Sequence, residues 1–555
     1  MPHKFLMLAR CLASLAVSIA AISRLEARPV TTPLPPPVDI RVDIKGLPVS
    51  ERRALSKILE AAQLLDEIYT RQVWPGTPRL IAMRRASQSP RAKAELEALY
   101  YYKGPWLADG TAFIPGVPAR RPIGDYYPTG ATKEQVARWL ATLSPDDRAR
   151  AMSPVTAIER APSGGFRVTP YGQRYASELE TAARDLRQAA RLTRDSQLAH
   201  FLQDRAEALT DDDYYASDVE FVGLKGPLDV TLAPYWPDDD DWFGVKTGYE
   251  STVGLVNGPA TARVAGITSH LQEMENNLPL DPSLRGERIS AAPVLVVDAI
   301  YEGGMSNHGR FLAVGYSEPE DLRVLNTVGA RTVTFRNILR ISAGPVYRPI
   351  ENTAVPSKAR AALQFDDLLD EILMVRLFDP LGPHLVTTTG APIQAALAGD
   401  GAVAGQIRSM LLSLWGHRYL IQHGDRDARE SGILYYAFLV PALARIQGSP
   451  GSPQQRGSTY ILNRLLAAGA MHIDLAGHFV VDSTKADTAV VVIARQFVSL
   501  MAKGDARGVH AQLVRYGSIR PDVAALMRRI KPRPIGPLRF STANELMAAR
   551  FNGGR

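Results

Sequence analysis

Apolar residues recur at helical spacing from about residue 50 onward. The residues at intervals of three and four are Leu55, Ile58, Leu59, Ala62, Leu65 and Ile68. This spacing puts them on one face of a helix. Ser50 precedes the run as a favourable N-cap residue, with Glu51 in the first turn. Similar patterns predict helices at about 90–102, 133–143, 172–195 and 196–209. The first two hundred residues are therefore expected to be mainly helical.

The pattern changes near residue 218. Short runs rich in β-branched and aromatic residues, mostly bounded by Gly or Pro, predict strands at 219–222, 228–232, 294–297, 311–314 and 332–335. One helix, 258–276, is inserted among them. From about residue 357 the helical pattern returns and continues to about 529, broken by 448–457 and by a hairpin at 473–481. The order helical, β-rich, helical predicts an α+β fold with two lobes separated by a cleft.

Residues 1–27 have the pattern of a signal peptide. Lys4 and Arg10 precede an apolar run, 11–22, that is too short to span a membrane. We expect export, with cleavage after Ala27 and a periplasmic or secreted location, although an uncleaved anchor is the alternative. Residues 28–45 form a Pro-rich linker. The lobes are expected at 46–355, with helix 258–276 able to pack on the other lobe, and at 356–545.

Composition narrows the chemistry. The single cysteine, Cys11, lies in the predicted signal, so thiol catalysis and cysteine-type zinc sites are excluded in the mature chain. The net charge of +7, from 64 basic and 57 acidic residues, is a small excess with no dense basic run. A nucleic-acid partner is therefore not expected. No later segment is apolar for long enough to predict a membrane span after signal cleavage.

Several runs, in order along the chain, resemble one family. They are Lys103-Gly104-Pro105-Trp106, Ser269-His270-Leu271-Gln272-Glu273-Met274-Glu275-Asn276-Asn277-Leu278-Pro279, Asn307-His308-Gly309 and Tyr516-Gly517. They are similar to the dipeptidyl peptidase III-like zinc metallopeptidases, peptidase family M49. The resemblance covers roughly residues 50 to 540. It implies a mostly helical lobe and a mixed lobe with a small β-barrel-like core.

The same resemblance places the family's zinc site on helices 366–379 and 402–422. Where the family has a His-Glu pair and a second His, this chain has Val375, Arg376 and Asp379. In the family, a Glu on the next long helix completes the zinc site, and this chain has Gln406 at that position. An isopropyl group cannot bind metal, and a guanidinium cannot accept a proton. The zinc ligands and the general base are therefore missing, and no cofactor is expected.

Three further positions depart from the family pattern. In the family, one segment presents a Glu and a Tyr to the substrate. The corresponding segment here is Pro234-Tyr235-Trp236-Pro237-Asp238, so Trp236 and Asp238 replace the Glu and the Tyr. A His before a Gly is replaced by Arg456. Residues that could still line the cleft and contact a peptide are Tyr235, Trp236, Asn307, His308 and His384.

Other polar residues allow competing interpretations. Asp379 with His384, His417 and His423 could form a substitute metal site. His417 and His423 are six residues apart, however, and so lie on different sides of a helix. A second acidic group, Asp366, Asp367, Asp370 and Glu371, is expected to form a solvent-exposed helix face.

The leading hypothesis is an exported, zinc-free pseudoenzyme of this family that binds a peptide or an envelope protein through the inherited cleft. One alternative is an active zinc peptidase with rearranged ligands that releases dipeptides. Another is a structural partner of an envelope protein.

Overall fold

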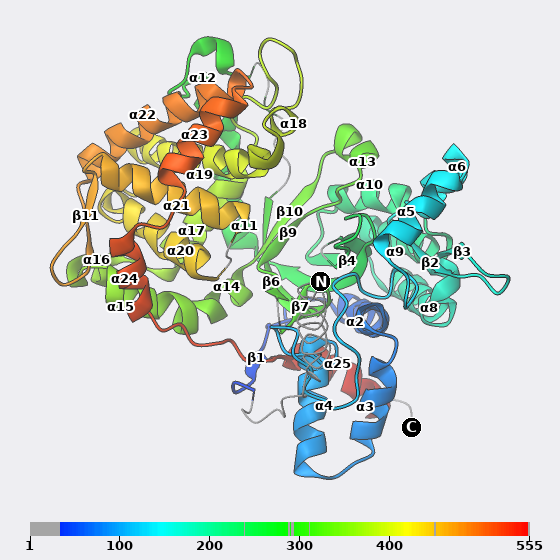
Figure 1. Cartoon of the computed structure of the whole chain (residues 1–555). Helices are drawn as coiled ribbons and strands as arrows, with labels where there is room; N and C mark the ends of the chain where they lie inside the picture. Colours follow the sequence, from blue (N-terminus) through cyan, green and yellow to red (C-terminus); the bar gives the residue numbers. More distant parts are fainter. Residues whose placement is uncertain are drawn as a thin grey trace, which may run out of the picture.

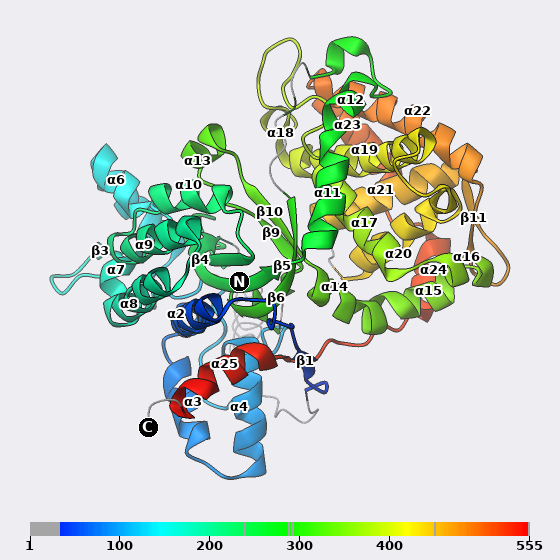
Figure 2. The same ribbon diagram turned by 180° about the vertical axis from the view of Figure 1, so that it is seen from behind.

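The computed structural model of the chain describes residues 34–237, 239–286, 289, 294–309, 311–448 and 451–552. The predicted signal peptide and the first residues of the predicted linker lie outside them. Figures 1 and 2 show two lobes side by side, with the strands of a sheet ending between them. Among the described helices, none combines the length and the apolar character that crossing a membrane requires.

The N-terminal lobe is built around one long helix, α2. Its helices are α2 (Val49–Val73), α3 (Thr77–Arg85), α4 (Pro90–Tyr102), α5 (Lys133–Thr142), α6 (Pro145–Ala151), α7 (Tyr171–Arg174), α8 (Ala176–Leu192), α9 (Ser196–Asp211) and α10 (Tyr215–Gly223). The apolar face that predicted α2 is fully buried, and it packs against α8 and the sheet. A small hairpin, β2 (Thr156–Arg160) and β3 (Phe166–Pro170), lies at the edge of the lobe.

The predicted strand at 219–222 is wrong, because these residues belong to α10. Ser217, Asp218, Phe221 and Val222 are buried, at the spacing of a helix face. A short β-branched run does not distinguish a strand from a buried helix segment.

The central sheet has five strands in the order β4-β5-β6-β10-β9. They are β4 (Leu228–Trp236), β5 (Gly248–Val256), β6 (Val294–Gly304), β10 (Arg331–Phe335) and β9 (Gly315–Glu318). Among the described residues of this sheet, β6 and β10 are the one parallel pair. In the described residues β4 and β9 are both edge strands. A mixed fold with a small sheet core is therefore confirmed, whereas a barrel is not shown.

Helices α11 and α12 connect the sheet to the second lobe, and several short elements lie between the strands of the sheet. The intervening elements are α11 (Gly258–Ser269), α12 (Leu271–Asn276), η1 (Pro282–Leu284), β7 (Asn307–His308), β8 (Phe311–Leu312) and α13 (Leu322–Thr327). One apolar cluster joins α11 and α12 to Val296 of β6 and to residues of the next lobe. Figure 2 shows α11 between the sheet and that lobe.

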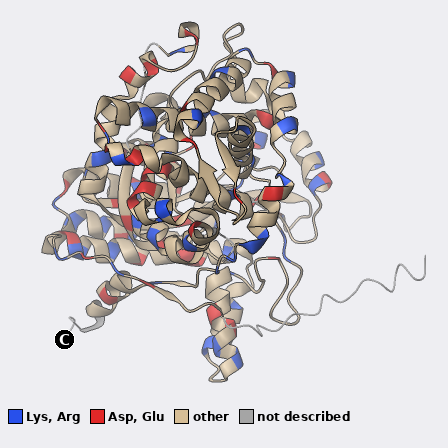
Figure 3. Ribbon diagram, turned by 90° about the vertical axis from the view of Figure 1, so that its left-hand side faces the viewer, with Lys and Arg blue, Asp and Glu red and all other residues tan. Residues whose placement is uncertain are grey.

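The second lobe is almost entirely helical. Its elements are α14 (Arg336–Ser342), the π-helical turn η2 (Ala343–Tyr347), α15 (Arg348–Ala354), α16 (Ser357–Ala362), α17 (Phe365–Leu377), α18 (Ile393–Ala396), η3 (Ala398–Asp400), α19 (Gly401–His423), η4 (Ala428–Gly432), α20 (Leu434–Gly448), α21 (Pro453–Ala467), α22 (Ser483–Ala502), α23 (Ala506–Tyr516) and α24 (Pro521–Arg529). The predicted hairpin is formed by β11 (Met471–Ile473) and β12 (Phe479–Val481). Acidic and basic residues are intermixed on the face drawn in Figure 3.

The C-terminal segment returns to the first lobe. Strand β13 (Leu538–Phe540) pairs in parallel with β1 (Val38–Ile40), and α25 (Ser541–Asn552) contacts α2. The last part of the predicted linker is thus paired in a two-stranded sheet. Both ends of the described chain belong to the same lobe (Figure 1).

Candidate functional site

A cavity of about 500 Å³ lies where the sheet meets the helical lobe. We call it the interlobe cavity. Strands β6, β9 and β10 contribute one wall, and α17, α19 and α20 contribute the other. One face of α17 and the residues just after it supply Ile372, Val375, Arg376 and Asp379, which recur at helical spacing. Gln406 of α19 lies on the same wall. The structure therefore brings together four of the six positions that the sequence singled out.

A second cavity, of about 730 Å³, adjoins the first. The two share Asp379, Gln406 and Gln454, and the second also reaches His384 and Arg408. His384, predicted as a cleft residue, is therefore close to the site.

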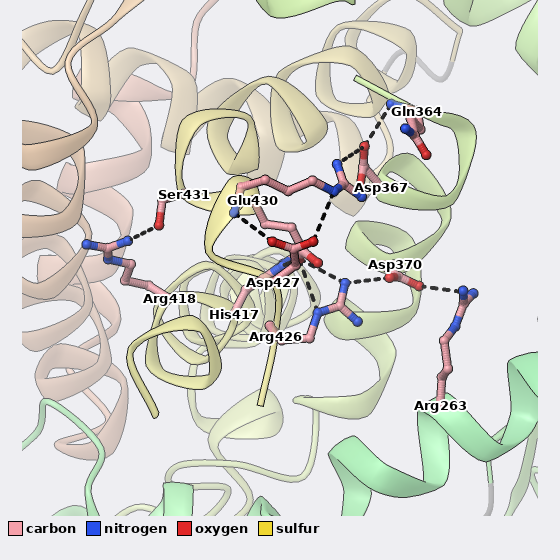
Figure 4. Close-up of polar contacts among 11 residues, drawn as sticks. Arg263, Gln364, Asp367, Asp370, His417, Arg418, Arg426, Asp427, Glu430 and Ser431 are labelled. Carbon is pink, nitrogen blue, oxygen red and sulfur yellow. Dashed lines mark hydrogen bonds and ion pairs between the residues drawn. The ribbon is translucent and has the colours of Figure 1, made fainter. Parts of the chain in front are cut away.

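The orientation of α17 is set on its opposite face by a network of acids and arginines. Asp367 caps the helix by accepting from the backbone N–H of Gln364 at 2.7 Å, and it also pairs with Arg429 at 3.0 Å. Asp370 pairs with Arg426 at 2.5 Å. Figure 4 shows these pairs linking α17 to the segment around η4. The cost of burying the acids is offset by arginines from another element, so α17 and the segment around η4 are joined by these ion pairs.

The acidic face expected to be solvent-exposed is therefore mostly buried. The Asp367, Asp370 and Glu371 side chains are only 6, 11 and 3% exposed. Asp366, at 43%, is the exception. The expectation failed because the balancing arginines come from distant segments, which helical periodicity does not reveal.

The histidines do not assemble a substitute metal site. His417 is buried and hydrogen-bonded to Glu430 at 2.6 Å, within the network of Figure 4. That contact and Arg426 lower the pKa of Glu430 to about 2, against the opposing effect of burial. His423 is stacked on Tyr419. Within the described residues, no three His, Cys, Asp or Glu side chains are grouped closely enough to hold a metal ion.

Asp379 is bound by two side chains of α19, through an ion pair and a hydrogen bond. It follows the end of α17, and its carboxylate accepts from Arg408 at 3.0 Å and from the Ser409 hydroxyl at 2.5 Å. Arg408 also donates to the Asp379 and Pro383 carbonyls, at 2.8 and 3.2 Å, and contacts His384 Nε2 at 2.7 Å. A metal ion at Asp379 would have to compete with this buried guanidinium. Sequence reasoning missed Arg408, although it lies only two residues beyond Gln406.

The loop after Asp379 is positioned by Glu275, which belongs to the family-like run 269–279. Glu275 of α12 is fully buried, and its carboxylate accepts from the backbone N–H of Gly382 at 2.8 Å and from that of Gly286. Gly382 has a φ of +75°, a conformation that glycine adopts without strain. Glu275 thus fixes the shape of the loop after Asp379, which we call the exit loop.

Two glycines lie where α19 meets its neighbours α17 and α21, and one of them allows a close approach. A Cβ on Gly416 would lie 1.9 Å from the ring of Phe378, the C-cap residue that follows α17. A Cβ on Gly457 would lie 3.5 Å from Cβ of Gln406. Glycine at 416 is therefore required for α17 and α19 to pack as they do.

Positive charge dominates the wall of the interlobe cavity. Arg376 donates to the Tyr316 carbonyl at 3.4 Å, which is long for a hydrogen bond. Burial and the neighbouring Arg445 cation lower the pKa of Arg376, but an arginine stays protonated at neutral pH. Arg445 pairs with Glu371 at 3.5 Å, and burial raises the pKa of Glu371 to about 7 despite this partner.

The remaining predicted residues lie elsewhere or are not described. Arg456 pairs with Asp400 at 2.9 Å and does not line the interlobe cavity. Tyr235 is on β4, at the opposite edge of the sheet from β9, hydrogen-bonded to Arg205 and Asp218. The side chain of Trp236 and the whole of Asp238 fall outside the described residues.

Asn307 and His308 lie on β7, in the first lobe. Asn307 donates to the Glu302 carbonyl at 3.2 Å and lines a different cavity, of about 370 Å³. His308 is buried and stacked on Tyr69, and burial lowers its pKa to about 3. Neither residue lines the interlobe cavity.

The residues of the interlobe cavity do not fit a zinc ion. A catalytic zinc site needs three His, Asp, Glu or Cys ligands around an open position. Val375 has no donor atom, Gln406 is neutral, and Asp379 is paired with Arg408. Arg376 and Arg445 add positive charge beside the position that a cation would take.

Comparison with known structures defines the class of protein. The fold is that of dipeptidyl-peptidase III, since the enzyme from Caldithrix abyssi superposes with a TM-score of 0.86 at 24% identity, over 92% of this chain and 98% of that one. Dipeptidyl-peptidase III from Corallococcus sp. strain EGB is 34% identical over 92% of this chain and 96% of that one, with a TM-score of 0.78. The chain belongs to the dipeptidyl-peptidase III family.

The chain is also similar in sequence to a longer plant protein. Nudix hydrolase 3 of Arabidopsis thaliana is 25% identical over 569 residues, which cover 92% of this chain and 73% of that protein. No protein-family model matches the chain.

Proposed function

We propose that this protein is an exported, zinc-free member of the dipeptidyl-peptidase III family that binds a peptide or protein ligand in its interlobe cavity without hydrolysing it. Export is supported by the signal-like residues 1–27. Binding is supported by the retained cavity and by the exit loop held in place by Glu275.

One observation carries the proposal. Arg376 stands at the family position of the general base, on the wall of the cavity, with the Arg445 cation as its neighbour. A general base must accept a proton from water, and an arginine does not do so at neutral pH. The changes at Val375 and Gln406 remove two ligands of the family's zinc site as well. Each change removes a separate requirement of metal-assisted hydrolysis.

Metal analysis combined with a turnover assay tests the proposal. The purified full chain is equilibrated with zinc, dialysed and analysed for bound metal, and it is then assayed on a dipeptidyl-naphthylamide. We expect substoichiometric zinc and no chelator-sensitive turnover. Stoichiometric zinc with turnover that a chelator abolishes would refute the proposal and favour the alternative of rearranged ligands.

Calorimetry with short peptides tests the binding half of the proposal. We expect saturable binding of peptides that are recovered intact after incubation. Absence of binding by any peptide in a diverse set would instead favour a structural role. Cell fractionation and N-terminal sequencing of the mature protein test export, which is refuted if the protein stays in the cytoplasm with residues 1–27 attached.

A further inference from the structure

We propose that the interlobe cavity binds an oxyanion, a carboxylate or phosphate group of its ligand, between Arg376 and Arg445. The inference deepens the proposed function and rests on it, because an oxyanion there and a zinc–water centre would compete for the same space. Three guanidinium groups, those of Arg376, Arg408 and Arg445, surround the two adjoining cavities. Only two carboxylates in the described residues pair with them, those of Asp379 and Glu371.

Arg376 has donors to spare. A guanidinium carries five N–H donors, and in the described part of the chain Arg376 makes a single hydrogen bond, the long one to the Tyr316 carbonyl. No ion pair of Arg376 occurs among those residues either. A lining cation without a counter-charge is costly unless a ligand supplies one.

Arg445 makes only a long ion pair with Glu371. Its Nη2 lies 3.5 Å from Glu371, at the limit of a hydrogen bond, and its Nη1 is buried without a hydrogen-bond partner in the described residues. The other carboxylate, Asp379, is already bound by Arg408 and Ser409. Neither acid therefore neutralises Arg376.

The rest of the lining suits an anionic group attached to a larger ligand. Ser317 and Thr332, whose hydroxyl oxygens are 3.0 Å apart on β9 and β10, add donors beside the arginines. Leu271, Val294 and Val314 make part of the wall apolar, which strengthens a charge-assisted hydrogen bond by excluding water. A volume of about 500 Å³ exceeds what an oxyanion alone would fill.

Calorimetric titration of the full chain at low ionic strength tests the inference. The probes are inorganic phosphate, a tripeptide with a free C-terminal carboxylate, and the same tripeptide as its C-terminal amide. The variants are Arg376→Met and the double variant Glu371→Gln with Arg445→Met, which avoids leaving Glu371 buried and unpaired. Arg348→Met is the matched control, because Arg348 lies on α15 with its side chain 66% exposed.

We expect saturable binding that Arg376→Met weakens about ten-fold or more, since a hydrogen bond to a charged group contributes strongly to binding. The double variant should weaken it similarly, and Arg348→Met should leave it unchanged. Preference for the free carboxylate over the amide would identify a peptide terminus as the source. Binding of phosphate alone would identify a phosphate group.

Two results would overturn the inference: no binding of phosphate or of the free-acid peptide to the wild type, or binding that Arg376→Met leaves intact. Arg376→Met should fold, because in the described part of the chain the Arg376 side chain makes only one, long hydrogen bond, and circular dichroism checks this. Failure of the proposed function is distinguishable, since it would appear as zinc-dependent turnover. Failure of the inference alone would appear as an inert protein without oxyanion binding.

Discussion

Glu371 offers the sharpest test of the electrostatics beside the interlobe cavity. Its side chain is 3% exposed on α17, and its one ion-pair partner in the described residues is Arg445, at 3.5 Å. Burial raises the pKa of Glu371 from 4.5 to about 7, against the lowering effect of Arg445. The variant Glu371→Gln keeps the shape of the side chain and removes its titration.

Proton linkage gives the direction in which the free energy of unfolding changes with pH. Between pH 4.5 and 7 the folded state holds a proton on Glu371 that the unfolded chain has released, so the free energy of unfolding falls as the pH rises. Stability contributed by the neutral acid is fully present below the unfolded pKa and is lost as the pH rises through the folded value. A shift of this size corresponds to about 3 kcal/mol in total, of which about 2.5 kcal/mol falls between pH 5 and 8.

Urea unfolding of the full chain at pH 5, 6, 7 and 8, followed by far-ultraviolet circular dichroism, measures this loss. Wild type should lose about 2.5 kcal/mol more than Glu371→Gln across that range. Glu180→Gln, at an exposed position of α8, is the control and should follow the wild type. Parallel pH profiles for wild type and Glu371→Gln would refute the reasoning.

Two matched pairs of variants on α19 test its packing, with urea unfolding as the measurement. Gly416→Ala should cost about 3 kcal/mol because its new Cβ meets the Phe378 ring, whereas Gly405→Ala, with open space around it, should gain up to about 1 kcal/mol. Similar effects for the two alanines would contradict that packing. Arg408→Met should cost about 1.5–3 kcal/mol by removing the hydrogen bonds that this buried guanidinium makes to Asp379 and Pro383, and the more exposed Arg418→Met less than about 1 kcal/mol. An equal cost for the two arginines would argue against the role given to Arg408.

Local sequence patterns predicted the helices well where packing agreed with periodicity. Helix α4, for example, spans the predicted residues 90–102. The ranges that the family resemblance gave for α17 and α19 differ from the observed ones by two residues or fewer at each end. Family resemblance located Val375, Arg376, Asp379 and Gln406, because the framework that brings α17 and α19 together is retained. Pattern alone could not have paired these two helices.

What the sequence could not predict is which distant groups meet. Arg445 reaches Glu371 from α20, and Arg408 reaches Asp379 from α19, so neither pair has a local signature. The acidic side of α17 appeared solvent-exposed for the same reason. Tyr235 was expected in the cleft, but it is bound to Arg205 at the far side of the sheet. Tertiary ion pairing decides these positions.

Rebuilding the zinc site provides the last prediction. Val375→His, Asp379→His and Gln406→Glu together restore three zinc ligands on one cavity wall, and metal analysis should detect more bound zinc than in wild type. We expect no turnover of a dipeptidyl-naphthylamide by this triple variant. Arg376 still occupies the base position, so no group there can take the proton of a zinc-bound water.

Adding Arg376→Glu supplies that carboxylate and removes one of the cations that oppose the metal. Any hydrolysis should therefore appear only in the quadruple variant, and a chelator should abolish it. Turnover in the triple variant would show that Arg376 is not what prevents catalysis. Zinc bound by neither variant would instead place the obstacle in Arg408 and Arg445, which both variants retain beside the new ligands.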